Sequence, residues 1–456
     1  MAKSKGGAST KNLSWWQLSL VGIGAIIGTG FFLGSSIAIK TGGPSAIFAF
    51  LLAALGTYVV FDSLARMTAN HPVKGSFRSY AKQAFGKWAG FSNGWVYWSS
   101  ELLIMGSQLT ALGIFTKFWF PNTPLWIFAS VYGVLGILII LTGISGFEKM
   151  ENIFAVIKVA AIFMFIIIAG VAIFGFLDGE KPNNSITYSY EGLFPHGIMG
   201  FWTAMIYAFY AFGGIEVMGI MANDLKDPKQ APKSGSVMLV MLATIYVVSL
   251  LMSIYLVPWD NFTTDESPFI IALDKYNLSF VPHVFNGALI IGGFSTMVAS
   301  LYAITTMIVT LAKDGDAPKF FSKVGKSNIP FRALGLTVTG LIFSIVVSIL
   351  LPDKIYEYFT TAAGLMLLYT WLFILLTYRK MHQTSFFQKM KLYTGLLLII
   401  IAVSGTWFDG SSRPGFLVSL GFIILIGIVT LSKRKKWKNE PPKKGQPTSL
   451  FEKGKG

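Results

Sequence analysis

The sequence predicts an all-α membrane protein with twelve transmembrane helices, and three observations support this prediction. Charged residues make up only 13% of the 456 residues and hydrophobic residues 53%, whereas a soluble protein carries about 25% charged residues. The apolar residues are gathered into runs of about twenty, the length that spans a bilayer as a helix. Short charged stretches separate these runs, and their basic residues fall mostly into alternate loops.

Twelve apolar runs can be placed along the chain, and each is interpreted as one helix. The runs cover residues 15–39, 44–65, 89–118, 125–145, 153–176, 197–222, 234–257, 282–312, 333–351, 356–378, 392–408 and 414–431. The third and eighth are longer than a bilayer needs, which is typical of helices that tilt or extend into water. The segment 265–277 is expected to be an external loop with a short interfacial helix.

The distribution of Lys and Arg predicts that both termini lie in the cytoplasm. With the N-terminus inside, 30 of the 37 basic residues fall on the cytoplasmic side, six fall outside and Lys158 lies within a span. Cytoplasmic loops carry such an excess, so the formal net charge of +16 indicates topology rather than nucleic-acid binding. The basic tail at Lys433-Arg434-Lys435-Lys436 is expected to rest on anionic membrane lipids.

A glycine cluster in the first span predicts a break in its helix. Residues 22–30 contain four glycines, and backbone polar groups become available inside a membrane only where a helix is broken. We expect a hinge there, followed by a half-helix from Phe31 whose free N–H groups attract an anion. A helix-packing face of small residues is the alternative. A dinucleotide-binding motif is excluded, because it needs a preceding strand.

The sixth span repeats this pattern at Gly213-Gly214, beside Glu216. A break here would leave carbonyl groups that attract a cation. A positive helix end in span one and a negative one in span six suit a zwitterion, with a carboxylate and an ammonium on one small carbon. Breaks five spans apart also suit two five-helix repeats of inverted topology.

The chain is therefore expected to have four parts. These are a cytoplasmic N-terminal tail (1–12), an inverted-repeat transport core of helices one to ten (13–380), helices eleven and twelve (381–432) and a basic cytoplasmic tail (433–456). No cysteine is present, which excludes disulfides and thiolate metal sites. No zinc spacing or nucleophile motif occurs, so we expect no enzyme activity, no metal and no cofactor.

Ionisable residues inside spans are costly in lipid and usually functional, and there are four: Asp62, Glu101, Lys158 and Glu216. Asp62 lies near the cytoplasmic end of span two and is best explained as reaching the interface. Glu216 either holds the hinge through backbone N–H groups or relays a proton. Glu101 is either protonated and packed or faces the solute.

Lys158 lies about 10 Å along its helix from Glu151 at the cytoplasmic edge. Snorkelling to the interface is one explanation for it. Otherwise its ammonium is buried, and it could exchange a proton in the physiological range or replace a coupling cation.

Short motifs occur in a fixed order along residues 13–379. They lie at residues 24–34 (GAIIGTGFFLG), 94–98 (GWVYW), 212–216 (FGGIE), 227–228 (DP), 232–233 (PK), 301–303 (LYA) and 312–321 (AKDGDAPKFF). Each is modest alone, but their order and spacing resemble the amino acid–polyamine–organocation (APC) superfamily, and within it the bacterial amino acid permeases. The resemblance implies a LeuT-type 5+5 inverted-repeat core with broken helices one and six, and an amino acid substrate.

The resemblance also implies a role for residues that match the family's motifs. The substrate-binding positions would be Ile26, Gly28, Thr29, Gly30, Tyr210, Phe212, Gly213 and Gly214. The three residues from Gly28 to Gly30 would hold the carboxylate, and the carbonyls of Ile26, Tyr210 and Gly213 the ammonium. Lys158 matches a fifth-helix lysine that stands where sodium binds in relatives, which implies coupling to protons, or exchange, without sodium. Glu216 matches a gating or proton-linked glutamate.

The chain departs from the family pattern at several positions. Glutamate is common where it has Gln108 and Asn223, and Asn and Arg where it has Ala299 and Thr306. Glu101 falls in the expected side-chain pocket, where an ionised acid would favour Lys, Arg or ornithine and a protonated one would not.

We therefore expect a secondary active amino acid transporter (permease) of the cell membrane that works by proton-coupled uptake or exchange of an L-amino acid. The alternatives are a polyamine or organic-cation transporter of the same fold and a receptor that binds an amino acid without transporting it.

Overall fold

The computed structural model of the chain describes residues 13–438, except residues 74, 178, 180–188, 223–224, 279, 326–328 and 352–353. Within these ranges the regular elements are all helices. Strand-like pairing among them is limited to two isolated bridges, Leu13 with Leu225 and Gly179 with Tyr276. The all-α class predicted from the composition is therefore confirmed.

The helices of the first half of the chain begin with an interrupted one. They are α1 (Trp15–Ile26), α2 (Thr29–Phe32), α3 (Gly34–Gly42), α4 (Ala46–Asn70), α5 (Ser76–Phe85), α6 (Lys87–Lys117), α7 (Leu125–Leu141) and α8 (Ile144–Ile173).

The second half of the chain contains another interrupted helix, formed by α10 and α11. The helices of this half are α9 (Tyr190–Leu193), α10 (Gly197–Tyr210), α11 (Ile215–Met221), α12 (Ala231–Leu256), α13 (Pro268–Leu273), α14 (Val281–Asp314), α15 (Phe331–Leu350), α16 (Ile355–Met381), α17 (Phe386–Phe408) and α18 (Arg413–Lys438). Each of the twelve predicted runs overlaps at least one of these helices, and α13 lies in the loop where a short helix was expected.

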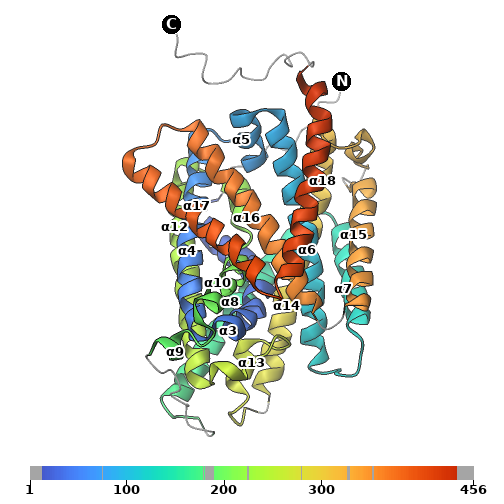
Figure 1. Cartoon of the computed structure of the whole chain (residues 1–456). Helices are drawn as coiled ribbons and strands as arrows, with labels where there is room; N and C mark the ends of the chain where they lie inside the picture. The colour runs from blue at the N-terminus through green and yellow to red at the C-terminus, as the bar shows by residue number, and fades with distance from the viewer. Residues whose placement is uncertain are drawn as a thin grey trace.

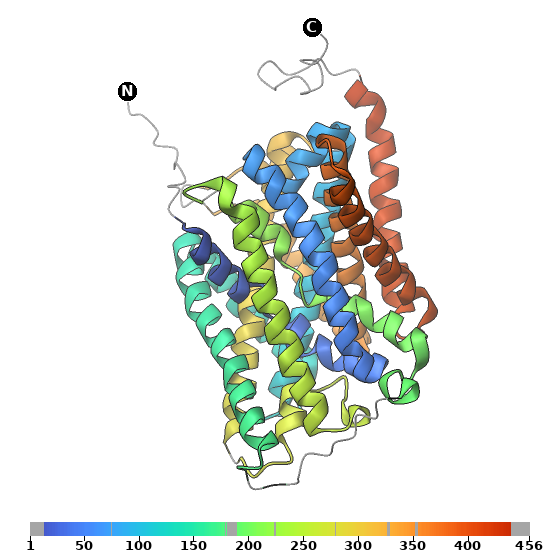
Figure 2. The same cartoon turned by 90° about the vertical axis from the view of Figure 1, so that its left-hand side faces the viewer.

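The long helices run side by side between two ends of the molecule (Figures 1 and 2). We call the end where α5 lies and α18 finishes the terminal end, and the end with α9 and α13 the distal end (Figure 1). Eight helical stretches among the described residues are long and apolar enough to cross a membrane, and α1 and α7 are shorter apolar helices. The outer faces of the long helices expose large apolar side chains, such as Val156 and Ile167 of α8 and Leu425 of α18. Such surfaces suit a lipid environment.

The two interrupted helices lie inside a ring of long ones. The segments α2, α3 and α10 pack against one another and against α4, α6, α14 and α16, whereas α17 and α18 pack on the outside against α4, α6, α10 and α16. Apolar burial drives this packing among the helices only in part, since lipid is itself apolar, and close contact of small residues supplies much of the rest.

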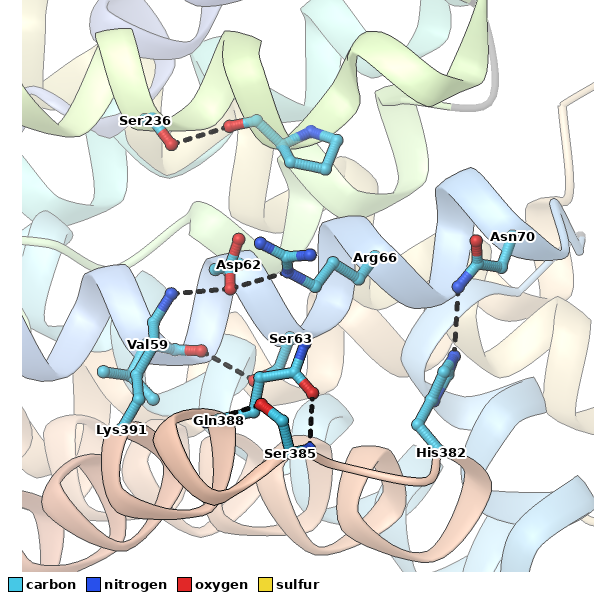
Figure 3. Close-up of polar contacts among 11 residues, drawn as sticks. Val59, Asp62, Ser63, Arg66, Asn70, Ser236, His382, Ser385, Gln388 and Lys391 are labelled. Atoms are coloured by element: carbon cyan, nitrogen blue, oxygen red, sulfur yellow. Dashed lines mark hydrogen bonds and ion pairs between the residues drawn. The ribbon is translucent and has the colours of Figure 1, made fainter.

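Asp62 joins the ring to the outer helix α17 (Figure 3). Its Oδ2 atom accepts hydrogen bonds from Arg66 Nε at 2.9 Å and from Lys391 Nζ at 2.6 Å. The Lys391 ammonium also lies 4.1 Å from the centre of the Tyr58 ring. Arg66 is 44% exposed and Lys391 29%, so this carboxylate belongs to an ion cluster near the terminal end, as its position in the sequence suggested.

A second ion cluster ties α5 to the end of α14. The buried Arg78 guanidinium binds Asp314 Oδ2 at 2.6 Å, also binds Asp316, and donates from Nε to the Gly90 carbonyl at 3.2 Å. Burial raises the pKa of the Asp316 carboxyl, and the charge of Arg78 opposes this shift. The cluster therefore links α5, α6 and the end of α14 at the terminal end.

Candidate functional site

The first interrupted helix breaks at Ile27 and Gly28. Both residues have extended backbones, and α2 begins at Thr29. The N–H groups in the first turn of a helix have no partner inside it, so Thr29 and Gly30 present free donors here. A side chain at Gly28 does not fit, because its Cβ would lie 2.7 Å from Thr296 Cγ2 of α14.

The second interrupted helix breaks between α10 and α11. Residues 211–214 form turns, and Gly214 has a φ of 109°, in the left-handed region that favours glycine. The Tyr210 carbonyl, one of the predicted ammonium ligands, already accepts a bond from Gly213 N at 2.9 Å. A carbonyl has a second lone pair, so it can still accept from a ligand. The glycine clusters therefore mark the two breaks.

The two breaks pack against each other. A Cβ on Gly30 would lie 3.0 Å from the Tyr210 ring and 3.2 Å from the Tyr210 carbonyl oxygen, and a Cβ on Gly214 would lie 3.5 Å from the Ile26 side chain. Residues nearly 200 positions apart thus form one site. Seven of the eight motif-matched residues lie here; the eighth, Phe212, points its ring to a neighbouring aromatic cluster.

That aromatic cluster surrounds the breaks. The Tyr246 ring of α12 stacks on Phe31 at a centroid distance of 3.7 Å and packs near Phe50 and Phe212. The Tyr246 hydroxyl donates to the carbonyl of Ala211 at 3.1 Å, within the second break. Tyr246 therefore connects the first half-helix after one break to the backbone of the other.

A hydroxyl network joins α6, α16 and the breaks. Ser107 Oγ of α6 is 3.0 Å from the Tyr210 hydroxyl and 3.1 Å from Thr360 Oγ1 of α16. The Tyr356 hydroxyl donates to the carbonyl of Thr29 at 3.0 Å. These bonds fix α6 and α16 to the broken segments.

A cleft of about 710 Å³ reaches this network from the distal end. Its wall includes Lys117, Asp265, Glu266 and Glu357, and Tyr356 also lines it. Burial, together with the charges of Asp274 and Asp265, raises the pKa of the Glu266 carboxyl. Tyr356 lines the cleft and also bonds to the Thr29 carbonyl, so this side chain lies between the cleft and the first break.

Two polar groups near the first break have no hydrogen-bond partner among the described residues. They are the buried Thr29 hydroxyl and Gln108 Oε1. Gln108 lies one turn from Leu112 on α6, and a Cβ on Gly293 would meet both Leu112 and Thr29. An unsatisfied buried polar group costs about 1–3 kcal/mol, which a polar ligand at this place would offset.

Lys158 lies behind the first break and is fully buried, so its ammonium does not snorkel to water. Its Nζ donates to Ser295 Oγ at 2.9 Å and to Glu151 Oε1 at 3.3 Å. Its stem packs on Gly292 of α14. The same stretch of α14 faces the first break. Its Gly293 packs against Thr29, and its Thr296 packs against Gly28.

Glu216 stands in the first turn of α11, just after the second break, and is fully buried. Its Oε2 accepts from Trp371 Nε1 of α16 at 3.2 Å, and it lies next to the backbone N–H groups of Gly214 and of Glu216 itself. Its Oε1 has no partner among the described residues. This geometry combines hinge-holding contacts with one free carboxylate oxygen.

Glu101 lies near the second break, because it interacts electrostatically with Tyr210 and Glu216. It is buried beside the hydroxyls of Ser300 and Tyr97, and its charge interacts with that of Glu216. It precedes Ser107 by six residues on α6, about 9 Å along the helix toward the terminal end. The Ser107 network thus separates it from the distal cleft.

Sequence reasoning overlooked several residues of this site: Ser107, Glu151, Tyr246, Ser295, Tyr356 and Trp371. Only Glu151 had a usable signal, because residues seven apart share a helix face. The others bond to partners more than thirty residues away, for which one sequence carries no local pattern.

Comparison with known proteins gives a consistent picture. The family model described as amino acid permease matches residues 17–432. The chain is 57% identical over 436 residues to the uncharacterized transporter YcgH of Bacillus subtilis (strain 168), covering 96% of this chain and 98% of the relative.

Two more distant relatives have names that describe a transport function. The chain is 29% identical over 431 residues to the aromatic amino acid transport protein AroP of Escherichia coli (strain K12), covering 92% and 94% of the two chains. It is 31% identical over 364 residues to the amino-acid permease RocC of Bacillus subtilis, covering 78% and 77%.

Proposed function

Because this chain belongs to the amino acid permease family, we propose that it is a secondary active transporter that carries an L-amino acid across the cell membrane by proton-coupled uptake or exchange. The observation that supports this most is the pair of helix breaks packed together, with Tyr356 between the first break and a cleft. A site of broken helices supplies the backbone donors and acceptors that a zwitterion needs inside an apolar slab.

The proposed topology has twelve transmembrane helices. Helices one to ten, residues 13–380, form the 5+5 inverted-repeat core, and residues 381–432 add two outer helices. The terminal end with its Arg78 cluster faces the cytoplasm, and the distal cleft opens to the outside. The excess of basic residues in the loops at the terminal end supports this orientation.

Substrate recognition is assigned to the two breaks. The N–H groups of residues 28–30 and the Thr29 hydroxyl bind the carboxylate, and the carbonyls of Ile26, Tyr210 and Gly213 bind the ammonium. Gly214 allows the turn, and Phe212 belongs to the aromatic wall. Gln108 Oε1 offers an acceptor to the same ligand.

Proton coupling is assigned to Lys158, with Glu216 as a gating residue. Lys158 packs on the stretch of α14 that also contacts Gly28 and Thr29, so a change in its charge bears on the carboxylate site. No sodium site is then required, since an ammonium stands beside the break in place of a metal cation.

A binding screen and an uptake assay test the proposed function. Purified protein is heated with each proteinogenic amino acid or with putrescine, and the unfolding midpoint is measured. A ligand at 100 times its Kd stabilises the folded state by about 2.7 kcal/mol, so a few related amino acids should raise the midpoint. The same compounds should then exchange across liposomes that contain the protein.

The alternatives predict other outcomes of this pair of assays. Stabilisation by putrescine alone would indicate a polyamine carrier, a reading that the acidic cleft wall and Glu101 favour. Stabilisation by an amino acid that is never exchanged would indicate a receptor.

Glu101→Gln tests whether this acid belongs to the side-chain pocket. We expect uptake of lysine and arginine to fall by about tenfold or more, since a lost charge-assisted bond costs roughly 1.5–3 kcal/mol, while uptake of neutral amino acids stays unchanged. Competition by each amino acid against a labelled mixture measures both. Equal effects on cationic and neutral substrates would remove Glu101 from the pocket.

A further inference from the structure

Three side chains behind the first break form a closed triangle. Lys158 Nζ lies 2.9 Å from Ser295 Oγ and 3.3 Å from Glu151 Oε1, and Ser295 Oγ lies 2.6 Å from Glu151 Oε2. Lys158 and Glu151 are two turns apart on α8, and Ser295 comes from α14. The triangle therefore spans the contact between these two helices.

The hydrogen bonds of the triangle have one direction. The Lys158 ammonium has no acceptor lone pair, so it donates to Ser295 Oγ, and the Ser295 hydroxyl donates in turn to Glu151 Oε2. A proton can move along such a chain without any side chain changing place.

The two ends of this chain differ in their access to water. The Lys158 side chain is 0% exposed, whereas that of Glu151 is 18% exposed. Glu151 also lies nearer the start of α8, toward the terminal end. A proton on Lys158 has no direct path to water at that end, but a proton on Glu151 does.

No other charged side chain competes for this role among the described residues that pack here. The helices α1, α7 and α13 carry no charged residue, and the one on α12, Lys233, lies over the Trp15 ring. On α14 the acidic and basic residues are His283, Lys313 and Asp314, all in its first or last turn. The charge that acts on Lys158 is that of Glu151.

We infer that Glu151 is the relay that passes the proton of Lys158 to the cytoplasmic water, with Ser295 as the bridge. An N–H bond of the ammonium breaks toward Ser295 Oγ while the Ser295 O–H bond breaks toward Glu151 Oε2. This leaves a neutral amine and a carboxylic acid. The new O–H bond then breaks toward water, which leaves a carboxylate and a hydronium ion.

This inference rests on the proposed function, in which Lys158 carries the coupled proton. Net uptake requires that proton to be released at each cycle, whereas exchange of one amino acid for another does not. Loss of the relay should therefore abolish proton-driven uptake and leave exchange intact, a split that a purely structural role of Glu151 would not produce.

The test uses the full chain in liposomes with a radiolabelled mixture of proteinogenic L-amino acids. Exchange is measured without a pH gradient, and accumulation with an imposed inward proton gradient. For Glu151→Gln we expect accumulation to fall at least about tenfold, since a proton-transfer group is worth about 10²–10⁴-fold in rate, with exchange unchanged. Glu151→Asp should restore part of the accumulation.

The exposed acid Glu191 of α9 provides the matched control, and Glu191→Gln should behave as wild type. Accumulation by Glu151→Gln equal to that of wild type would overturn the relay, as would a wild type that exchanges but ignores the proton gradient. A wild type that does not even exchange would instead overturn the proposed function. Should Glu151→Gln not fold, Ser295→Ala decides: reduced accumulation with normal exchange supports the relay, and no change overturns it.

Discussion

Gly30→Leu is expected to abolish substrate binding. Even a Cβ at this position would lie 3.0 Å from the Tyr210 ring and 3.2 Å from the Tyr210 carbonyl oxygen, so a leucine fills the space between the two breaks. Steric crowding and the loss of hydrogen bonds to a charged ligand each cost roughly 1–3 kcal/mol. We expect the affinity for the amino acid found in the thermal screen to fall at least about hundredfold, as measured by calorimetry.

The control for this variant is the same substitution at a roomy glycine. A Cβ on Gly335 of α15 meets nothing within 4 Å, so Gly335→Leu should bind as wild type. The milder Gly30→Ala covers the case in which the leucine variant does not fold. Binding by folded Gly30→Leu at wild-type affinity would show that the carboxylate site lies elsewhere.

Lys158→Ala is expected to uncouple transport from protons. The ammonium is fully buried and packs on the stretch of α14 that faces Gly28 and Thr29. Without it, no basic group on the described part of α8 or α14 touches this stretch, and Glu151, which bonds to Ser295 there, loses the ammonium beside it. The uptake rate should therefore no longer change between acidic and alkaline external medium. Proton flux, followed with a pH-sensitive dye inside liposomes, should fall at least about tenfold, in keeping with the loss of a proton-transfer group.

Lys233→Ala serves as the comparison for this loss. Lys233 is an exposed lysine whose ammonium lies 4.1 Å from the centre of the Trp15 ring, and its removal should leave the pH dependence of uptake as it is in wild type. An undiminished pH response in Lys158→Ala would assign the proton to another group, with Glu216 the next to test.

Several features of the fold could be read from the sequence because they are local. A membrane helix requires a run of apolar residues, and each predicted run overlaps a helix of the structure, whereas the polar helix α5 (Ser76–Phe85) lies between two runs. The breaks at residues 27–28 and 211–214 follow the glycine clusters, since a helix ends where its own residues permit another backbone conformation. Asp62 could be placed near an interface because it lies close to the cytoplasmic end of the predicted run 44–65.

The sequence alone could not predict which side chains of different helices bond to each other. Lys158 could be identified as an unusual buried cation, but its bond to Ser295 depends on how α8 and α14 are rotated about their axes. Glu101 shows the same limit, because position along α6 does not say that it meets Tyr97, Ser300 and Glu216.

By itself, then, the sequence determined the helical class, the approximate position of each long apolar helix and the two places where helices break. Those properties follow from hydrophobicity and backbone preference within a short stretch of chain. Only the tertiary structure decided that the two breaks meet, that Tyr246 and Tyr356 bond to their carbonyls, and that Glu151 and Ser295 enclose Lys158. Contacts of that kind depend on the packing angles and rotations of helices far apart in the chain.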